Sequence, residues 1–398
     1  MVHVLGHYFD AVVFWATLLV ACCVIILGIA AHILYSLNPG RQRAKLVARS
    51  RDALRRDMDR MAEYLDGLPN SGLAVRQPFE LGLAAMTAYQ WGQAVEHFQK
   101  AMVEGKGAEL VALSNLIGVC HYTQGRLDEA LKDSEESARL AEEFGDEEGK
   151  APALGNIGVI WHDKGELDRA LQYKEQALTI AHQLGDQWAE AIYLANIGNI
   201  WHDKGELDKA LQYYGQALEL SRDLGDKWGV AGDLAGIASI YRDKGVLDEA
   251  LQYDKEALAM ARAIGHRLGV VTDLGNIASI YRYKGKLGAA LKFGEQSLAM
   301  ARKVGYRLGV ATDLANIGLV LTDMKKYEQA VPRLVEALTI MLASGVADGP
   351  RQVLTGLVRC EDELGRKRVQ ELLKDAGLDD AGASDLLGRT DQMRRGRP

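Results

Sequence analysis

A basic side chain recurs at a fixed place every 40 residues, at His162, His202, Arg242 and Arg282. Aspartate follows the first three of these residues, and Tyr283 follows the fourth. The two histidine pairs look like the His/Asp dyad that performs acid–base catalysis. Their recurrence at an identical place in a repeat indicates positions on a helix surface instead, and not a catalytic group.

No other catalytic or ligand-binding motif is present. The sequence has no GxGxxG after a strand, no P-loop, no HExxH and no paired-cysteine metal motif. Cys120 and Cys360 are 240 residues apart, and the four cysteines give no disulfide framework. The net charge of −7 argues against a nucleic-acid binder, which would carry a basic face. We therefore predict that the protein is not an enzyme and binds no cofactor, metal or nucleic acid.

Self-similarity with a period of 40 residues dominates the chain. Copies of one pattern begin at Leu116, Leu154, Leu194, Leu234, Leu274 and, more weakly, Leu314. Residues 79–103 look like a divergent first copy. Together these segments predict about seven helix pairs.

These segments resemble tetratricopeptide repeats, in the longer form seen in kinesin light chains. One copy carries the family pattern at Gly158, Trp161, Gly165, Ala170, Tyr173 and Ala177. The resemblance covers roughly residues 79–345, and Lys325 departs from it by replacing the glycine between two helices. It implies an all-α fold, a right-handed α-solenoid over residues 76–345. Neighbouring pairs must stack in such a fold, because one pair cannot bury its apolar faces.

The physical chemistry of one repeat agrees with this fold. The pattern predicts a first helix, helix A, over about 187–204 and a second, helix B, over about 207–224. Gly205 ends helix A because glycine adopts positive φ at no steric cost. Asp186 precedes helix A, where a carboxylate caps exposed N–H groups. Gly198 is small because the two helices approach closely there.

The N-terminal region predicts a membrane anchor. Residues 11–37 contain no Lys, Arg, Asp or Glu over 27 positions, which is long enough to span a bilayer. Residues 1–10 lack Lys and Arg, whereas residues 41–60 hold eight, so residues 1–10 should lie outside and the repeats in the cytoplasm. Residues 38–75 are predicted to form a basic amphipathic helix beside the membrane. A cleaved signal peptide or a lipobox at Cys22 fits less well, since the start is not basic and apolar residues continue after the cysteine.

The C-terminal region divides into two parts. Residues 346–378 read as a polar helix pair, which an open stack needs at its end to stay soluble. Residues 379–398 are rich in Gly, Asp and Ser, and we predict a disordered tail there.

Asparagine forms a row along the A helices, at Asn156, Asn196, Asn276 and Asn316, with Gly236 interrupting it. Asn199 lies on the same helix as Asn196. The resemblance implies that the A helices line a concave groove and that such amides hold the backbone of an extended peptide. In the alternative interpretation, the amides cap or bridge neighbouring helices.

The recurring basic residues form a second row on the A helices, and the later repeats carry more positive charge. We hypothesise that acidic residues of a bound segment face Arg242 and Arg282, alongside His162 and His202. In the alternative, this row is a solvated charged face.

The function predicted from these features is a membrane-anchored scaffold or adaptor that holds an extended segment of an unidentified protein partner in the groove. A peptide-responsive regulatory subunit and a self-assembling structural protein are the alternatives. Neither the partner nor the oligomeric state follows from the sequence.

Overall fold

The computed structural model describes residues 73–88, 90–344 and 349–395. The predicted segments 1–10, 11–37 and nearly all of 38–75 lie outside the described residues. Within the described ranges, no helix combines the length and the apolar character that crossing a membrane requires. The membrane anchor therefore stays a prediction.

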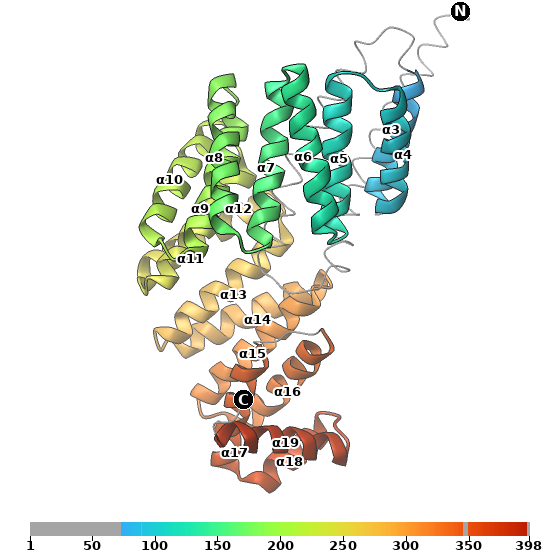
Figure 1. Ribbon diagram of the computed structural model, residues 1–398. Coiled ribbons are helices and arrows are strands. Elements are labelled where there is room, and N and C mark those ends of the chain that lie inside the picture. Colours follow the sequence, from blue (N-terminus) through green and yellow to red (C-terminus); the bar gives the residue numbers. More distant parts are fainter. Residues whose placement is uncertain (1–72, 89, 345–348, 396–398) are drawn as a thin grey trace, which may run out of the picture. The chain divides into compact units, whose positions relative to one another are not determined.

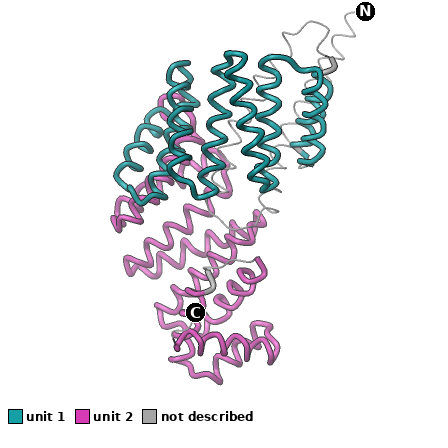
Figure 2. Tube along the Cα trace, in the orientation of Figure 1, with its two compact units in different colours: residues 1–35, 42–220 teal, residues 36–41, 221–398 magenta. Residues whose placement is uncertain are grey.

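The described residues form two compact units, which divide between residues 220 and 221 (Figures 1 and 2). Unit 1, residues 73–220, contains four helix pairs. Its helices are α3 (Leu73–Thr87), α4 (Trp91–Glu104), α5 (Ala108–Thr123), α6 (Leu127–Phe144), α7 (Glu147–Asp163), α8 (Leu167–Leu184), α9 (Gln187–Asp203) and most of α10 (Leu207–Asp223).

Unit 2, residues 221–395, contains three further pairs and three terminal helices. Its helices are α11 (Lys227–Asp243), α12 (Leu247–Ala263), α13 (Arg267–Tyr283), α14 (Leu287–Lys303), α15 (Arg307–Asp323), α16 (Tyr327–Ala343), α17 (Gly349–Leu364), α18 (Arg366–Asp375) and α19 (Asp380–Arg394). The predicted all-α array of about seven stacked helix pairs is confirmed. We call α5, α7, α9, α11, α13 and α15 the A helices, and the helices that follow each of them the B helices.

The turns between helices have the predicted chemistry. Gly205 and its equivalents adopt positive φ, as does Lys325, the only non-glycine residue in the described ranges to do so, at φ 60°. A side chain is disfavoured in this conformation because its Cβ crowds the following carbonyl. Asp186 caps α9, where its carboxylate accepts a hydrogen bond from the backbone N–H of Ala189 at 2.9 Å.

One place on each B helix faces a small residue on its A helix, and the two sizes are matched. A Cβ on Gly158 would lie 2.9 Å from Lys174 Cγ, and a Cβ on Gly198 would lie 2.9 Å from the Tyr214 ring. In the α11–α12 pair the B helix carries the shorter Asp254, and Ala238 takes the place of the glycine. The repeat thus keeps one packing scheme while the residue on helix B changes.

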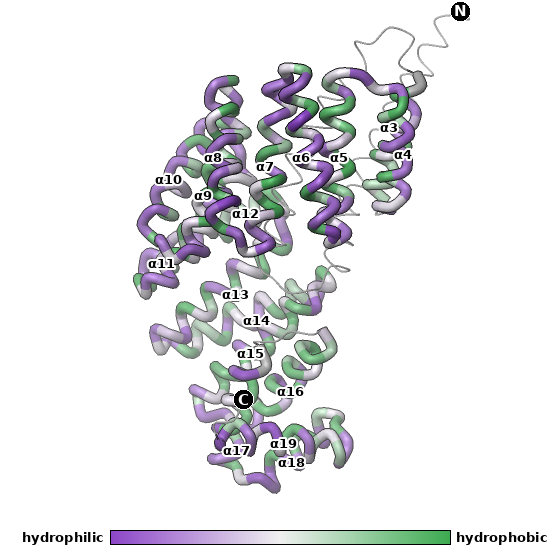
Figure 3. The backbone as a smooth tube through the Cα atoms, viewed as in Figure 1, coloured by the Kyte–Doolittle hydropathy of each residue, from purple (hydrophilic) through white to green (hydrophobic). Residues whose placement is uncertain are grey.

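The prediction of a disordered tail over residues 379–398 is wrong for residues 380–394, which form α19. Asp379 caps this helix, and the apolar Leu386 and Leu387 are buried in the core cluster of unit 2. The hydroxyl of Thr390 donates a hydrogen bond to Glu361 Oε2 of α17 at 3.0 Å. Figure 3 shows that hydrophobic and hydrophilic residues alternate along these C-terminal helices, as amphipathic helices require.

Candidate functional site

Two members of the basic row, His162 and Arg282, each contact an aspartate of the next A helix. His162 Nε2 lies 2.7 Å from Asp203 Oδ2, and Arg282 Nε donates to Asp323 Oδ2 at 2.6 Å. At the equivalent place in the preceding repeat, the Tyr122 hydroxyl donates to Asp163 Oδ2 at 2.8 Å. In each case the acceptor follows the donor by 41 residues, so this ladder ties successive repeats together.

The ladder changes at Arg242 because Tyr283 occupies the place of the next aspartate. Arg242 instead donates from Nη1 to both oxygens of Asp254, at 2.9 and 2.7 Å, within its own helix pair. Asp254 is fully buried, and two charge-assisted hydrogen bonds offset the cost of burying its charge. Tyr283 is left with 77% of its surface exposed.

These pairs change the expectation for the basic row. Arg242 and Arg282 each have a carboxylate partner in the chain, and His162 is buried against Asp203. His202, at the end of α9, is half-buried. An acidic ligand at this row would have to share or displace those carboxylates. The groove role of the four residues stays a prediction.

Three members of the asparagine set make hydrogen bonds inside the chain. Asn156 Nδ2 donates to Asn115 Oδ1 of the preceding A helix at 2.8 Å, and Asn276 Nδ2 lies 3.5 Å from Asp254 Oδ1. Asn199 Oδ1 accepts a hydrogen bond from the Tyr214 hydroxyl. Each of these contacts uses one atom of the amide, which leaves its other atom for another partner.

Asn196 and Asn316 differ from the other three. Neither amide makes a hydrogen bond with a residue that the structure describes, and neither is sealed from solvent. Asn196 has 9% of its surface exposed, and Asn316 is half-buried. Both amides therefore keep a donor and an acceptor for a ligand.

Lys174 is a buried cation that the sequence interpretation missed. It is 3% exposed on α8, and its Nζ lies 5.7 Å from the centre of the Tyr193 ring on α9. Burial lowers the pKa of the Lys174 ammonium to about 7, because water no longer stabilises the charge. The sequence did contain a sign of this unusual position, because Lys174, Tyr214 and Asp254 occupy equivalent places in successive repeats.

Buried aspartates on the A helices of unit 2 were also missed. Asp233, Asp273 and Asp313 recur every 40 residues and are each 2–3% exposed. Asp233 Oδ2 accepts a hydrogen bond from the Ser221 hydroxyl at 3.0 Å, whereas Asp313 Oδ2 has no partner in the described chain. Burial raises the pKa of Asp313 to about 7, against a smaller opposing effect of a hydrogen bond from Ser297. These buried aspartates could have been recognised in the sequence, because an aspartate recurs every 40 residues within an apolar stretch.

Metal-binding and thiol chemistry find little support here. Among the described residues, no group of three or more His, Cys, Asp or Glu side chains is placed to hold a metal ion. Cys120 and Cys360 are unbridged and buried, and burial raises the pKa of both thiols. A buried neutral thiol is a poor nucleophile.

Comparison with known protein families agrees with the repeat pattern. The tetratricopeptide repeat family matches residues 109–183, 150–223 and 231–303. A search of curated proteins finds no match.

Several solved structures share the fold at low sequence identity. A signal transduction ATPase with a tetratricopeptide repeat sensor, from Pyrococcus horikoshii, has a TM-score of 0.61 and 17% identity, over 85% of this chain and 52% of that one. The apo quorum sensor NprR from B. thuringiensis has a TM-score of 0.59 and 15% identity, over 88% and 98%. A Rap protein complexed with competence and sporulation factor has a TM-score of 0.56 and 14% identity, over 94% and 98%.

Proposed function

We propose that this tetratricopeptide repeat protein is a membrane-anchored scaffold or adaptor. Its A helices hold an extended segment of a partner protein through side-chain amides. The observation that carries the proposal is the pair Asn196 and Asn316, whose amides have no partner among the described residues and reach solvent. Amides of this kind can bond a peptide backbone whatever its side chains are.

The basic row has a different role in this proposal. Because His162 and Arg282 bond aspartates of the next A helix, they fix the spacing between repeats and hold the asparagines in register. Tyr283 interrupts this ladder and offers an exposed aromatic ring to a ligand. The segment is therefore held by backbone hydrogen bonds and by one aromatic contact, with less need for acidic residues.

Similar structures support a peptide ligand. The structure of the Rap protein contains competence and sporulation factor, and NprR is described as a quorum sensor. At 14–15% identity, these structures share only the fold with this chain. Binding of a peptide by this chain is therefore part of our proposal.

The proposal of a membrane anchor is based on the apolar residues 11–37 and on the basic residues that follow them. Tethering would raise the local concentration of the partner at the membrane. A reporter that is active only in the cytoplasm, fused after Arg60, tests this arrangement. Activity is expected, and a fusion that is expressed but inactive would place the repeats outside the cytoplasm.

Affinity capture with the full-length chain tests the proposed ligand face. The double variant Asn196→Ala/Asn316→Ala removes the two unpartnered amides, while Gln176→Ala/Gln216→Ala removes two exposed amides from B helices. Proteins captured by the wild type and by the B-helix variant, but lost from the A-helix variant, would support the proposal. Equal capture by all three proteins would contradict it.

A further inference from the structure

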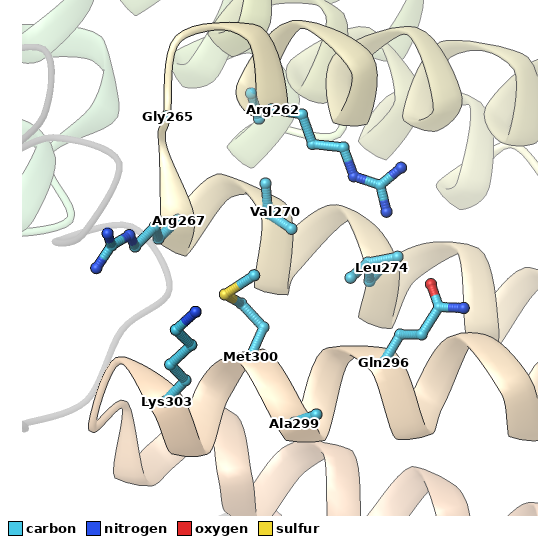
Figure 4. Close-up of a pocket in the computed structure, with 10 residues that line it drawn as sticks. Arg262, Gly265, Arg267, Val270, Leu274, Gln296, Ala299, Met300 and Lys303 are labelled. Carbon is cyan, nitrogen blue, oxygen red and sulfur yellow. The ribbon is translucent and has the colours of Figure 1, made fainter.

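A groove with an apolar floor opens on the surface of unit 2. It lies between α12 and α14, and α13 forms its floor (Figure 4). The floor consists of the buried Val270 and Leu274, and the half-buried Met300 forms one wall. The groove has a volume of about 460 Å³, which is within the range of sites that hold a small molecule or a few side chains.

Basic side chains surround this apolar floor. Arg262, Arg267 and Lys303 line the groove, and none of its lining residues is acidic. All three are exposed, and none forms an ion pair with a residue that the structure describes. Figure 4 shows Arg262 directed across the groove toward Leu274 and Lys303 rising from α14 beside Met300, whereas the guanidinium of Arg267 points outward from the rim. An occupant of this groove should combine an apolar group with negative charge.

Unit 1 carries a surface with the complementary character. Phe144, at the turn between α6 and α7, has 43% of its surface exposed, although large apolar side chains are usually buried. The residues beside it are acidic: Glu142, Glu143, Asp146, Glu147 and Glu148. Glu143 pairs with Arg139, whereas Glu142 has no ion pair with any described residue. We call residues 142–148 the acidic turn.

The basic residues of the groove and the residues of the acidic turn lie at equivalent positions of different repeats, and their charges are opposite. Arg262 and Arg267 correspond to Glu142 and Glu147, which lie 120 residues earlier, and Lys303 corresponds to Glu143, 160 residues earlier. The wider surroundings follow the same trend. Residues 73–220 carry 12 Lys/Arg and 24 Asp/Glu, whereas residues 261–310 carry nine Lys/Arg and two Asp/Glu.

We infer that the groove of one copy of this protein receives the acidic turn of a second copy. Phe144 enters the apolar floor, and Glu142 faces Arg262 at the rim. The basic segment 41–60 is a poor occupant, because its eight Lys/Arg would face the like charges of Arg262, Arg267 and Lys303. The contact joins two different surfaces, so it is heterologous and links copies head to tail.

Co-capture of two full-length copies with different tags, expressed together and solubilised in mild detergent, tests this contact. Wild-type copies should capture each other, and the yield should fall at high salt because the rim charges are exposed. Arg262→Glu in both copies should reduce capture at least about tenfold, since it reverses a charge at the contact. Failure of wild-type copies to capture each other would overturn the inference.

A charge exchange separates a direct contact from a general effect on folding. Copies that all carry Glu142→Arg should capture each other poorly, whereas a Glu142→Arg copy should capture an Arg262→Glu copy, because the unaltered groove of the first copy still fits the unaltered acidic turn of the second. Lys292→Glu, on an exposed face of α14 outside the groove, is the matched control and should capture like the wild type. Absence of recovery in the exchanged pair, or an equal loss with Lys292→Glu, would contradict the assignment.

Discussion

Units 1 and 2 carry opposite charges at one buried position that is equivalent in their repeats. In unit 1 the position holds Lys174, and in unit 2 it holds Asp254. Lys174 has an aromatic ring nearby and loses its charge readily, whereas Asp254 is paired with Arg242. The same helix packing therefore accepts either sign, provided that the buried charge is removed or paired.

The surfaces of the two units also differ. Residues 73–220 have a formal net charge of −12, whereas residues 221–398 have a net charge of +3. Packing requires the small and apolar residues in each repeat, but it leaves the turn residues free to change. The repeats thus share one interior scheme and present two different surfaces to partners.

The largest expected effect in this comparison is at the Asp254 pair. Arg242→Ala removes the cationic partner of a buried carboxylate and should lower the free energy of unfolding by about 3–5 kcal/mol. Urea denaturation of the full-length chain measures this change. Arg302→Ala breaks an ion pair with Glu336 in which both side chains are nearly half exposed, and should cost less than about 1 kcal/mol. Similar losses in the two variants would show that burial does not distinguish the pairs.

Lys174 should give unit 1 a stability that depends on pH. The pKa of Lys174 is about 7 in the folded chain and about 10.5 unfolded, so the unfolded chain binds more protons between these values. The free energy of unfolding should therefore rise from pH 7 to pH 10.5, by the order of 2–4 kcal/mol from this residue. Lys174→Met should remove that rise, whereas Lys292→Met, at an exposed site, should retain it. A rise that persists in Lys174→Met would assign it to another group.

Asp313 should give unit 2 the opposite dependence. Its pKa is about 7 folded and about 3.8 unfolded, so the folded chain binds more protons between these values, and the free energy of unfolding should fall from pH 3.8 to pH 7. Asp313→Asn should be more stable than the wild type at pH 8 by about 1–3 kcal/mol, because the buried charge is gone. Thermal unfolding at several pH values measures this difference. Asp375→Asn, on the exposed side of α18, should change little, and a comparable gain there would argue against burial as the cause.

The turn at Lys325 allows a smaller and reciprocal test within unit 2. Lys325→Gly should raise the free energy of unfolding by about 1 kcal/mol, because glycine adopts positive φ without a steric penalty. Gly285→Lys, at the equivalent turn one repeat earlier with φ 70°, should lower it by a similar amount. Chemical denaturation that gives the same sign for both variants would contradict this explanation.

The helices and turns were predictable because each depends on residues close together in the sequence. Gly205, Asp186 and the period of 40 residues define where helices begin and end. Helix α19 was missed because composition alone indicated disorder, whereas burial of Leu386 and Leu387 against the preceding helices stabilises it.

The partners of the charged residues were not predictable from spacing alone. Arg242 and Arg282 occupy equivalent positions, yet one bonds Asp254 in its own pair and the other bonds Asp323 in the next repeat. Tyr283 removes the acceptor 41 residues beyond Arg242, and Gly294 takes the place of Asp254 in the pair of Arg282. The partner of a buried side chain depends on all the residues that surround it in space. Spacing along the sequence does not show which of these residues it will contact.

Site-specific photo-crosslinking in cells tests most directly whether a partner lies on the A helices. A benzoylphenylalanine placed at Tyr283 keeps an aromatic ring at an exposed site of α13, and the same residue at Val103 of α4, which is 79% exposed, serves as the control. We expect a covalent adduct with a partner protein from position 283 and none from position 103. Adducts from position 103 alone, or from both positions alike, would contradict a ligand held along the A helices.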